Sequence, residues 1–323
     1  MSRDVAYHLR TNKNVERALF ADLLRRIAPH LPSRTRDYDY VGLGGPHLED
    51  FASVQAAFGC KKMTSLETEP YVQVRQRFNL PHCRVRPRLK STTDFVSEYE
   101  TGKRPLLIWF DYTKHDWKQQ IQECCELLVK LPHFSIFKVT LVCVPKYLYT
   151  PGGNENPMAG RLNKLNELFA DLGPFEEDDV REARFHLTLF KIFARAVAIA
   201  IKDSQGFVCR SLAAYHYSDR TPMLTITTTV GPAEGIRKLI LDSDLATWPF
   251  ARLAWRSPIG IDVPDFSLRE RLAVDRLLPD ATAKSIHKRL KLRFADNIRQ
   301  SRQVLSHYIK FARHVPHFVR IRP

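Results

Sequence analysis

Short apolar runs alternate with helical segments along about two-thirds of the chain, and this alternation limits the fold more than any other feature. The sequence predicts strands at residues 38–43, 63–66, 82–86, 106–110 and 135–144, with helices between them. Two further runs, 207–217 and 223–230, are joined by a five-residue segment with Asp and Pro, which favours a hairpin. The pattern predicts an α/β fold with a doubly wound, mostly parallel sheet and a terminal antiparallel hairpin.

The same pattern divides the chain into three parts. We expect an N-terminal helical segment at residues 1–34, a cofactor-binding α/β domain at 35–231, and a mainly helical, basic C-terminal region at 232–323. A periodic apolar pattern predicts the first helix at about residues 14–30. Residues 267–278 and much of the basic remainder are also predicted to be helical.

Three glycines stand where the first predicted strand of this domain runs into a helix. Gly42, Gly44 and Gly45 form a G-x-G-G pattern followed by Pro46. Without Cβ atoms, the backbone N–H groups of such a turn can approach a ligand closely. The spacing falls short of the full dinucleotide-binding pattern, so a tight turn without a ligand remains an alternative.

Two carboxylates follow later strands of the predicted sheet. Glu67 comes 23 residues after Gly44 at the end of the second strand, where an acid can accept hydrogen bonds from ribose hydroxyls. An ordinary surface acid beside Glu69 is the alternative. Asp111 follows the apolar run 107–110, which puts it at the crevice where open α/β sheets bind ligands. Both acids are therefore candidate site residues.

These strand-end features, in this order and closed by a hairpin, resemble class I S-adenosylmethionine-dependent methyltransferases, which are Rossmann-like, and among them the O-methyltransferase-like type. The resemblance covers residues 38–230 and implies a seven-stranded sheet whose last strand is reversed. It also implies that S-adenosylmethionine is the cofactor. It implies these roles: Gly42, Gly44 and Gly45 under the methionine part, Glu67 on the ribose, Thr93 and Asp94 beside the adenine, and Asp111 and Tyr112 at the methyl-transfer mouth.

The sequence departs from this family at two places. Pro46 and His47 replace the usual third glycine. The segment after the fourth strand is Asp-Tyr-Thr, whereas enzymes that methylate exocyclic base nitrogens carry Asn/Asp-Pro-Pro-Tyr there. The second departure argues against methylation of adenine or cytosine amino groups. A hydroxyl acceptor would need a base, and Asp111, Lys114 and His115 are the candidates in this segment.

Positive charge is concentrated at the end of the chain. The net charge is +15, of which residues 281–323 contribute +10 through eleven Lys and Arg against one acid. Such a region predicts a polyanionic partner, RNA or DNA, although a solvated basic face is the alternative. If residues 284–313 formed one helix, its cations would share one stripe suited to a phosphate backbone. The candidate contacts are Lys284, Lys288, Lys291, Arg299 and Arg302.

The leading hypothesis is an S-adenosylmethionine-dependent methyltransferase that acts on nucleic acid or a nucleotide-containing substrate, without a metal. A non-catalytic nucleic-acid-binding or effector protein that keeps the fold is the alternative. A third hypothesis groups Glu49, Asp50, Glu67 and Asp111 as metal ligands of a phosphodiesterase.

Other features of the sequence indicate the cellular compartment. No apolar run reaches the ~20 residues that span a bilayer, and the sequence begins without the apolar stretch of a secretory signal. None of the six cysteines forms a C-x-x-C pair. These features predict a cytoplasmic protein without a membrane partner, and they leave the oligomeric state open.

Overall fold

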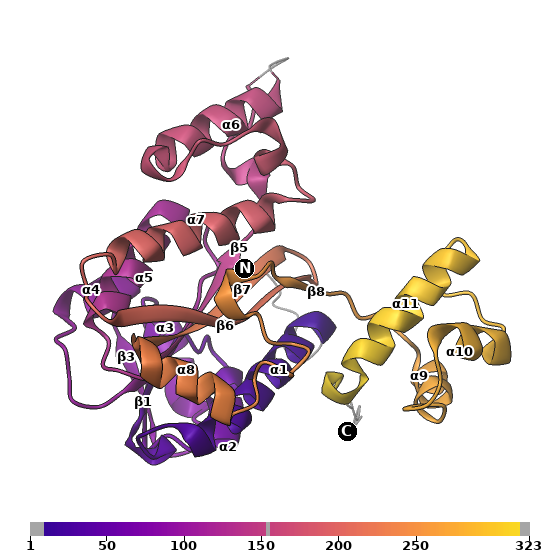
Figure 1. Ribbon diagram of the computed structural model, residues 1–323, viewed down its shortest axis with the longest axis horizontal. Coiled ribbons are helices and arrows are strands. Elements are labelled where there is room, and N and C mark those ends of the chain that lie inside the picture. Colours follow the sequence, from indigo (N-terminus) through magenta and orange to yellow (C-terminus); the bar gives the residue numbers. More distant parts are fainter. Residues whose placement is uncertain (1–9, 153–155, 317–323) are drawn as a thin grey trace. The chain divides into compact units, whose positions relative to one another are not determined.

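The computed structural model describes residues 10–152 and 156–316 (Figure 1). These residues form two compact units. The main unit contains Ala21–His216 and Thr221–Ile259. The second unit contains the described residues up to Phe20, the short segment Tyr217–Arg220, and the chain from Gly260 onward.

One mixed sheet of eight strands organises the chain, in the order β3-β2-β1-β4-β5-β7-β6-β8. The strands are β1 (Asp39–Gly42), β2 (Lys62–Glu67), β3 (Val85–Leu89), β4 (Leu106–Asp111), β5 (Ile136–Val142), β6 (Phe207–Ser218), β7 (Pro222–Pro232) and β8 (Ile259–Ile261). β1 to β5 pair in parallel, whereas β7 lies antiparallel to β5. The predicted Rossmann-like sheet with a terminal hairpin is confirmed. β8 was not predicted, because three residues are too few to show a periodic pattern.

The central strands are buried along their whole length. Every residue of β5 is buried, as are the first five residues of β4. Continuous burial is expected where helices cover both faces of parallel strands. Figure 1 shows α4, α5 and α7 on one side of the sheet and α2 and α8 on the other. The bounds of these helices are α2 Glu49–Phe58, α4 Thr92–Glu98, α5 Trp117–Lys130, α7 Phe185–Ala200 and α8 Ala233–Asp242.

Three more helices belong wholly or partly to the main unit. α3 (Pro70–Phe78) connects β2 to β3, and α6 (Pro157–Leu168) lies between β5 and α7 in the sequence. α1 (Thr11–Ile27) begins in the second unit and ends in the main unit. It starts three residues earlier than the sequence predicted, and the 3₁₀ turn Ala28–His30 follows it.

The basic region is helical, as predicted, but it is not one helix. α9 (Leu268–Asp275), α10 (Ala283–Leu290) and α11 (Ile298–Phe311) follow one another. Lys291 has a left-handed backbone, with φ of 54°, and ends α10. Asn297 then caps a new helix by accepting a hydrogen bond from the Gln300 N–H. The condition for a single stripe of cations, one helix across residues 284–313, is therefore not met, because this break separates the cations into two groups.

Asn12 joins the separate segments of the second unit. Its side-chain amide donates to the Ser218 carbonyl oxygen at 3.0 Å, and its side-chain oxygen accepts from the Val263 N–H at 2.8 Å. The carboxylate of Asp219 also accepts from the backbone N–H groups of Asn12 and Lys13, at 2.9 Å each. These N–H groups open α1 and have no partner within the helix, so Asp219 acts as its cap from more than 200 residues away.

Candidate functional site

The register of three neighbouring strands brings the predicted site residues to one edge of the sheet. Gly42 of β1 pairs with Ser65 of β2 and with Trp109 of β4. Gly44, Glu67 and Asp111 each lie two residues past this level, at the carboxyl ends of their strands. Adjacent strands are ~4.8 Å apart, so the backbones of Glu67 and Asp111 lie about one strand spacing from β1, on opposite sides of it. The structure thus places Asp111 at the edge where it was expected.

Gly44 occupies a position that a side chain could not share. A Cβ atom there would lie 2.3 Å from Leu48 Cδ2, 2.8 Å from Phe51 Cε2 and 2.9 Å from Ser65 Oγ. The Gly44 N–H donates to Ser65 Oγ at 3.3 Å, and its carbonyl oxygen accepts from the Leu48 N–H at 3.0 Å. The turn is therefore packed closely between β2 and the start of α2.

Gly45 faces the open side of the same turn. Its φ of 50° is one that L side chains rarely adopt, and a Cβ atom there would meet nothing within 4 Å. Within the part of the chain that the structure describes, its backbone N–H has no hydrogen-bond partner. The turn therefore has a backbone N–H that is available as a donor, and its predicted contact with the cofactor stays a prediction.

Glu67 is half-buried, and one of its carboxylate oxygens is fixed by the backbone. Oε1 accepts hydrogen bonds from the N–H groups of Thr68 at 2.8 Å and Glu69 at 3.0 Å. These groups lie just before α3, whose positive helix end favours a carboxylate. Among the described residues, Oε2 has no hydrogen-bond partner, so the orientation of the carboxylate is set while one oxygen stays available.

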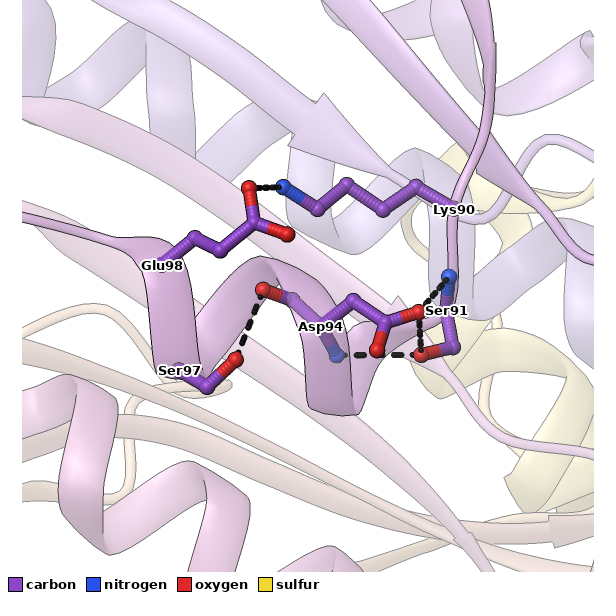
Figure 2. Close-up of polar contacts among 5 residues, drawn as sticks. All are labelled: Lys90, Ser91, Asp94, Ser97 and Glu98. Atoms are coloured by element: carbon purple, nitrogen blue, oxygen red, sulfur yellow. Dashed lines mark hydrogen bonds and ion pairs between the residues drawn. The ribbon is translucent and has the colours of Figure 1, made fainter.

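The segment after β3 is arranged mainly as a helix cap. Ser91 Oγ accepts from the Asp94 N–H at 3.0 Å, and the Asp94 carboxylate accepts from the Ser91 hydroxyl at 2.6 Å (Figure 2). Hydrogen bonds from Ser91 lower the pKa of Asp94 below its ordinary value. Figure 2 also shows the ion pair of Lys90 with Glu98 that spans this turn. The cap occupies the carboxylate of Asp94, so its predicted cofactor contact stays a prediction.

Replacing Ser91 tests the cap. We expect Ser91→Ala to lower the free energy of unfolding by ~1 kcal/mol, because the N–H of Asp94 loses its acceptor. Chemical denaturation measures this change, and Ser97→Ala serves as a control, since its hydroxyl bonds only a carbonyl oxygen within α4, that of Asp94. Equal stability of the two variants would show that the cap contributes nothing.

Tyr112 and Thr93 share one buried carboxylate. Glu123 on α5 accepts from the Tyr112 hydroxyl at 2.7 Å through one oxygen and from the Thr93 hydroxyl at 2.5 Å through the other. Burial raises the pKa of Tyr112 well above its ordinary value, and the neighbouring Cys124 and Glu123 raise it further. Both hydroxyls thus have partners within the fold, and the contacts predicted for Tyr112 and Thr93 stay predictions.

Aromatic side chains lie beyond the ends of β4 and β5. The rings of His115 and Tyr147 stack with their centroids 4.3 Å apart and an angle of 22° between their planes. Both side chains are exposed, and Lys146 Nζ lies 5.7 Å from the centre of the Tyr147 ring. Asp111, at the end of β4, is partly buried. This side of the edge could therefore receive a planar or anionic acceptor beside a carboxylate.

The remaining sequence candidates divide between the units. Lys284, Lys288, Lys291, Arg299 and Arg302 are exposed and belong to the second unit. Among residues 10–152 and 156–316, no three His, Cys, Asp or Glu side chains group in a way that could hold a metal ion. Ser65, whose hydroxyl accepts from the Gly44 N–H, was not predicted as a site residue. Its place in the predicted strand 63–66, two residues before Glu67, was the available signal.

The chain also matches a known protein family. Residues 5–323 match the family described as "Putative O-methyltransferase". The chain belongs to this family. Membership agrees with the methyltransferase-like Rossmann fold predicted from the sequence, and it supports methyl transfer with S-adenosylmethionine as the cofactor. None of the curated proteins compared with this family member matches it.

Solved structures similar to this family member include an O-methyltransferase from Bacillus cereus in complex with S-adenosylhomocysteine. It is 12% identical, covers 72% of the present chain and 84% of its own, and has a TM-score of 0.39. An rRNA methylase from Streptococcus thermophilus is 11% identical, covers 65% and 93%, and has a TM-score of 0.35. In the described part of the chain, no helix has the length and apolar character needed to cross a membrane.

Proposed function

We propose that the main unit binds S-adenosylmethionine at the edge formed by β2, β1 and β4 and transfers its methyl group to a nucleic acid. The main support for a cofactor site here is that Gly44, Glu67 and Asp111 lie at the same height along three adjacent strands. One edge thus presents a backbone donor between two carboxylates. This is the donor and acceptor set that an amino-acid group and a ribose require.

The residues present fit this cofactor. Glycine at position 44 lets the turn pack against Leu48, Phe51 and Ser65, where a Cβ atom would collide, and the Gly45 N–H has no hydrogen-bond partner among the described residues. The methionine part carries a carboxylate that such a donor can bind. Glu67 Oε2 is available to the hydroxyls of a ribose, which are donors.

S-adenosylmethionine supplies a methyl group on a sulfonium, and its transfer to an acceptor oxygen breaks the carbon–sulfur bond and leaves the electron pair on sulfur. The protein contributes mainly position. In our proposal, Glu67 and the glycine turn fix the two ends of the cofactor. Asp111 accepts the proton of the acceptor hydroxyl as the new carbon–oxygen bond forms. The stacked rings of His115 and Tyr147 provide a flat surface for the acceptor beside Asp111.

Charge in the second unit supports a nucleic-acid acceptor. His287, Lys288, Lys291, Arg293 and Ile298 line a cavity of about 420 Å³ at the break between α10 and α11. Among the described residues, no carboxylate forms an ion pair with Lys288, Lys291 or Arg293. Three cations gathered without a counter-charge favour the binding of phosphate. The family match itself identifies an O-methyltransferase, so the nucleic acid remains our proposal.

A labelling experiment tests the activity. We expect the full chain to bind S-adenosylhomocysteine in a calorimetric titration. We also expect it to transfer a labelled methyl group from S-adenosylmethionine to RNA or DNA, so that RNase or DNase releases the label from the polymer. Asp111→Asn should keep the cofactor affinity and lose most of the transfer, because it removes the proton acceptor. A folded wild-type chain that binds neither form of the cofactor would contradict the proposal. Methyl transfer only to small molecules would contradict the proposal that the acceptor is a nucleic acid.

We also propose that the protein works in the cytoplasm. All six cysteines are free thiols. Burial raises the pKa of Cys60 to about 12, which keeps this thiol protonated at neutral pH. Free thiols are typical of a reducing compartment.

A further inference from the structure

α3 exposes its apolar residues and buries its glutamines. Tyr71, Val74 and Phe78 are 66%, 63% and 91% exposed, whereas Gln76 is fully buried and Gln73 is 8% exposed. This arrangement reverses the usual pattern of a helix that packs on a sheet. Burying a carboxamide is unfavourable unless its groups are hydrogen-bonded. The buried carboxamide of Gln76 therefore needs a hydrogen-bonded contact.

That contact is with the glycine turn. Gln76 Nε2 donates to the Gly45 carbonyl oxygen at 2.8 Å, and Asn79 Nδ2 donates to the Pro46 carbonyl oxygen at 2.9 Å. At the other end of α3, the segment that leads into the helix bonds the Glu67 carboxylate through the N–H groups of Thr68 and Glu69. The glycine turn is thus bonded to the end of α3, and the proposed ribose acceptor to the residues just before its start.

The turn depends on these bonds because packing does not hold its open side. A Cβ atom on Gly45 would meet nothing within 4 Å. The peptide between Gly45 and Pro46 has no N–H, so its orientation is fixed through its carbonyl oxygen alone. If that oxygen turned toward the ligand, it would repel the carboxylate of a bound amino acid. Gln76 holds it on the side of α3.

Stability alone does not explain a glutamine at this position. In the described structure, Gln76 Oε1 is buried and has no hydrogen-bond partner. An unpaired buried oxygen is destabilising, and leucine would fill a similar volume without one. We therefore propose that Gln76 is a positioning residue that holds the glycine turn ready for the amino-acid half of the cofactor. This inference rests on the proposed function, and it adds a residue that touches neither the cofactor nor the acceptor.

Two ligands distinguish the positioning of the glycine turn by Gln76 from a general contribution of Gln76 to the stability of the fold. S-adenosylhomocysteine contains both the amino-acid half and the adenosine half, whereas 5′-methylthioadenosine lacks the amino acid. We expect Gln76→Leu to weaken S-adenosylhomocysteine about five- to tenfold in calorimetry, the value of one hydrogen bond. The affinity for 5′-methylthioadenosine should not change, because Glu67 keeps its place. Gln73→Leu is the matched control, a buried glutamine of the same helix, and should alter neither affinity.

The outcomes are distinct. Equal affinities of Gln76→Leu and Gln73→Leu for S-adenosylhomocysteine would overturn the inference, and so would equal losses for both ligands. If Gln76→Leu does not fold, Asn79→Ala provides the same comparison, with a smaller selective loss for S-adenosylhomocysteine expected and an equal loss for both ligands overturning the idea. If the folded wild type binds neither ligand, the proposed function fails, and this inference fails with it.

Discussion

S-adenosylhomocysteine is expected to bind the Glu67→Ala variant with a dissociation constant roughly 5- to 150-fold higher than that of the wild type. This range corresponds to ~1–3 kcal/mol, the cost of leaving ribose hydroxyls without an acceptor in a partly buried site. Glu67 is suited to this role because Oε1 is fixed by two N–H groups while Oε2 is available. Isothermal titration calorimetry measures the change.

Two further variants make the result specific. Glu69→Ala removes a neighbouring exposed acid and should bind the ligand as the wild type does. Glu67→Gln keeps one acceptor oxygen, so its loss should be smaller than that of Glu67→Ala. Unchanged affinity in a folded Glu67→Ala variant would show that Glu67 does not bind the ribose, and the proposed cofactor site would then rest on the glycine turn and Asp111.

The affinity of the protein for RNA or DNA is expected to fall by about three orders of magnitude between 50 and 200 mM salt, if about six phosphates are neutralised. The reason is the release of counterions from the nucleic acid when Lys and Arg replace them. The cations expected to act are those of α10, the break after it, and α11. Fluorescence anisotropy with a labelled oligonucleotide at several salt concentrations measures the slope.

A charge variant tests which cations bind. Changing Lys284, Lys288, Lys291, Arg299 and Arg302 to Gln should weaken binding and flatten the salt dependence, while cofactor affinity stays the same. Arg269→Gln combined with Arg276→Gln is the control, because these exposed residues of the second unit lie outside the cavity between α10 and α11. An unchanged slope in the fivefold variant would identify the region as a solvated basic surface and remove the main support for a nucleic-acid acceptor.

The parts of the fold that follow from local pattern were predictable from the sequence. The glycine turn and the strand-end acids were found because strands of apolar residues end there on residues of a different kind. β3 was predicted at residues 82–86 but spans Val85–Leu89. Pro87 lies in its middle, and a proline is tolerated there because β3 is an edge strand. Edge position is a property of the whole sheet and is invisible in the local sequence.

Two features could not be predicted from the local sequence pattern. A stripe of Tyr71, Val74 and Phe78 would ordinarily face the core, yet it is exposed, and Gln76, which donates to the Gly45 carbonyl oxygen, is buried instead. Likewise, the helical arc of cations required an unbroken helix. The left-handed Lys291 and the capping Asn297 interrupt this helix, and neither is a glycine or proline, the residues that most clearly indicate a helix break.

The links made by Asn12 bear on how the chain is completed during synthesis. The first turn of α1 leaves the ribosome early, but the carboxylate that caps it belongs to Asp219, and Val263 follows later still. At typical rates of synthesis, roughly 5–20 residues per second, the start of α1 waits on the order of ten seconds or more for these partners. The second unit therefore cannot close around the start of α1 until the chain has been made past Val263. A fragment ending before residue 217 would lack every partner of Asn12 named above, so expression of such a fragment should leave the beginning of α1 uncapped.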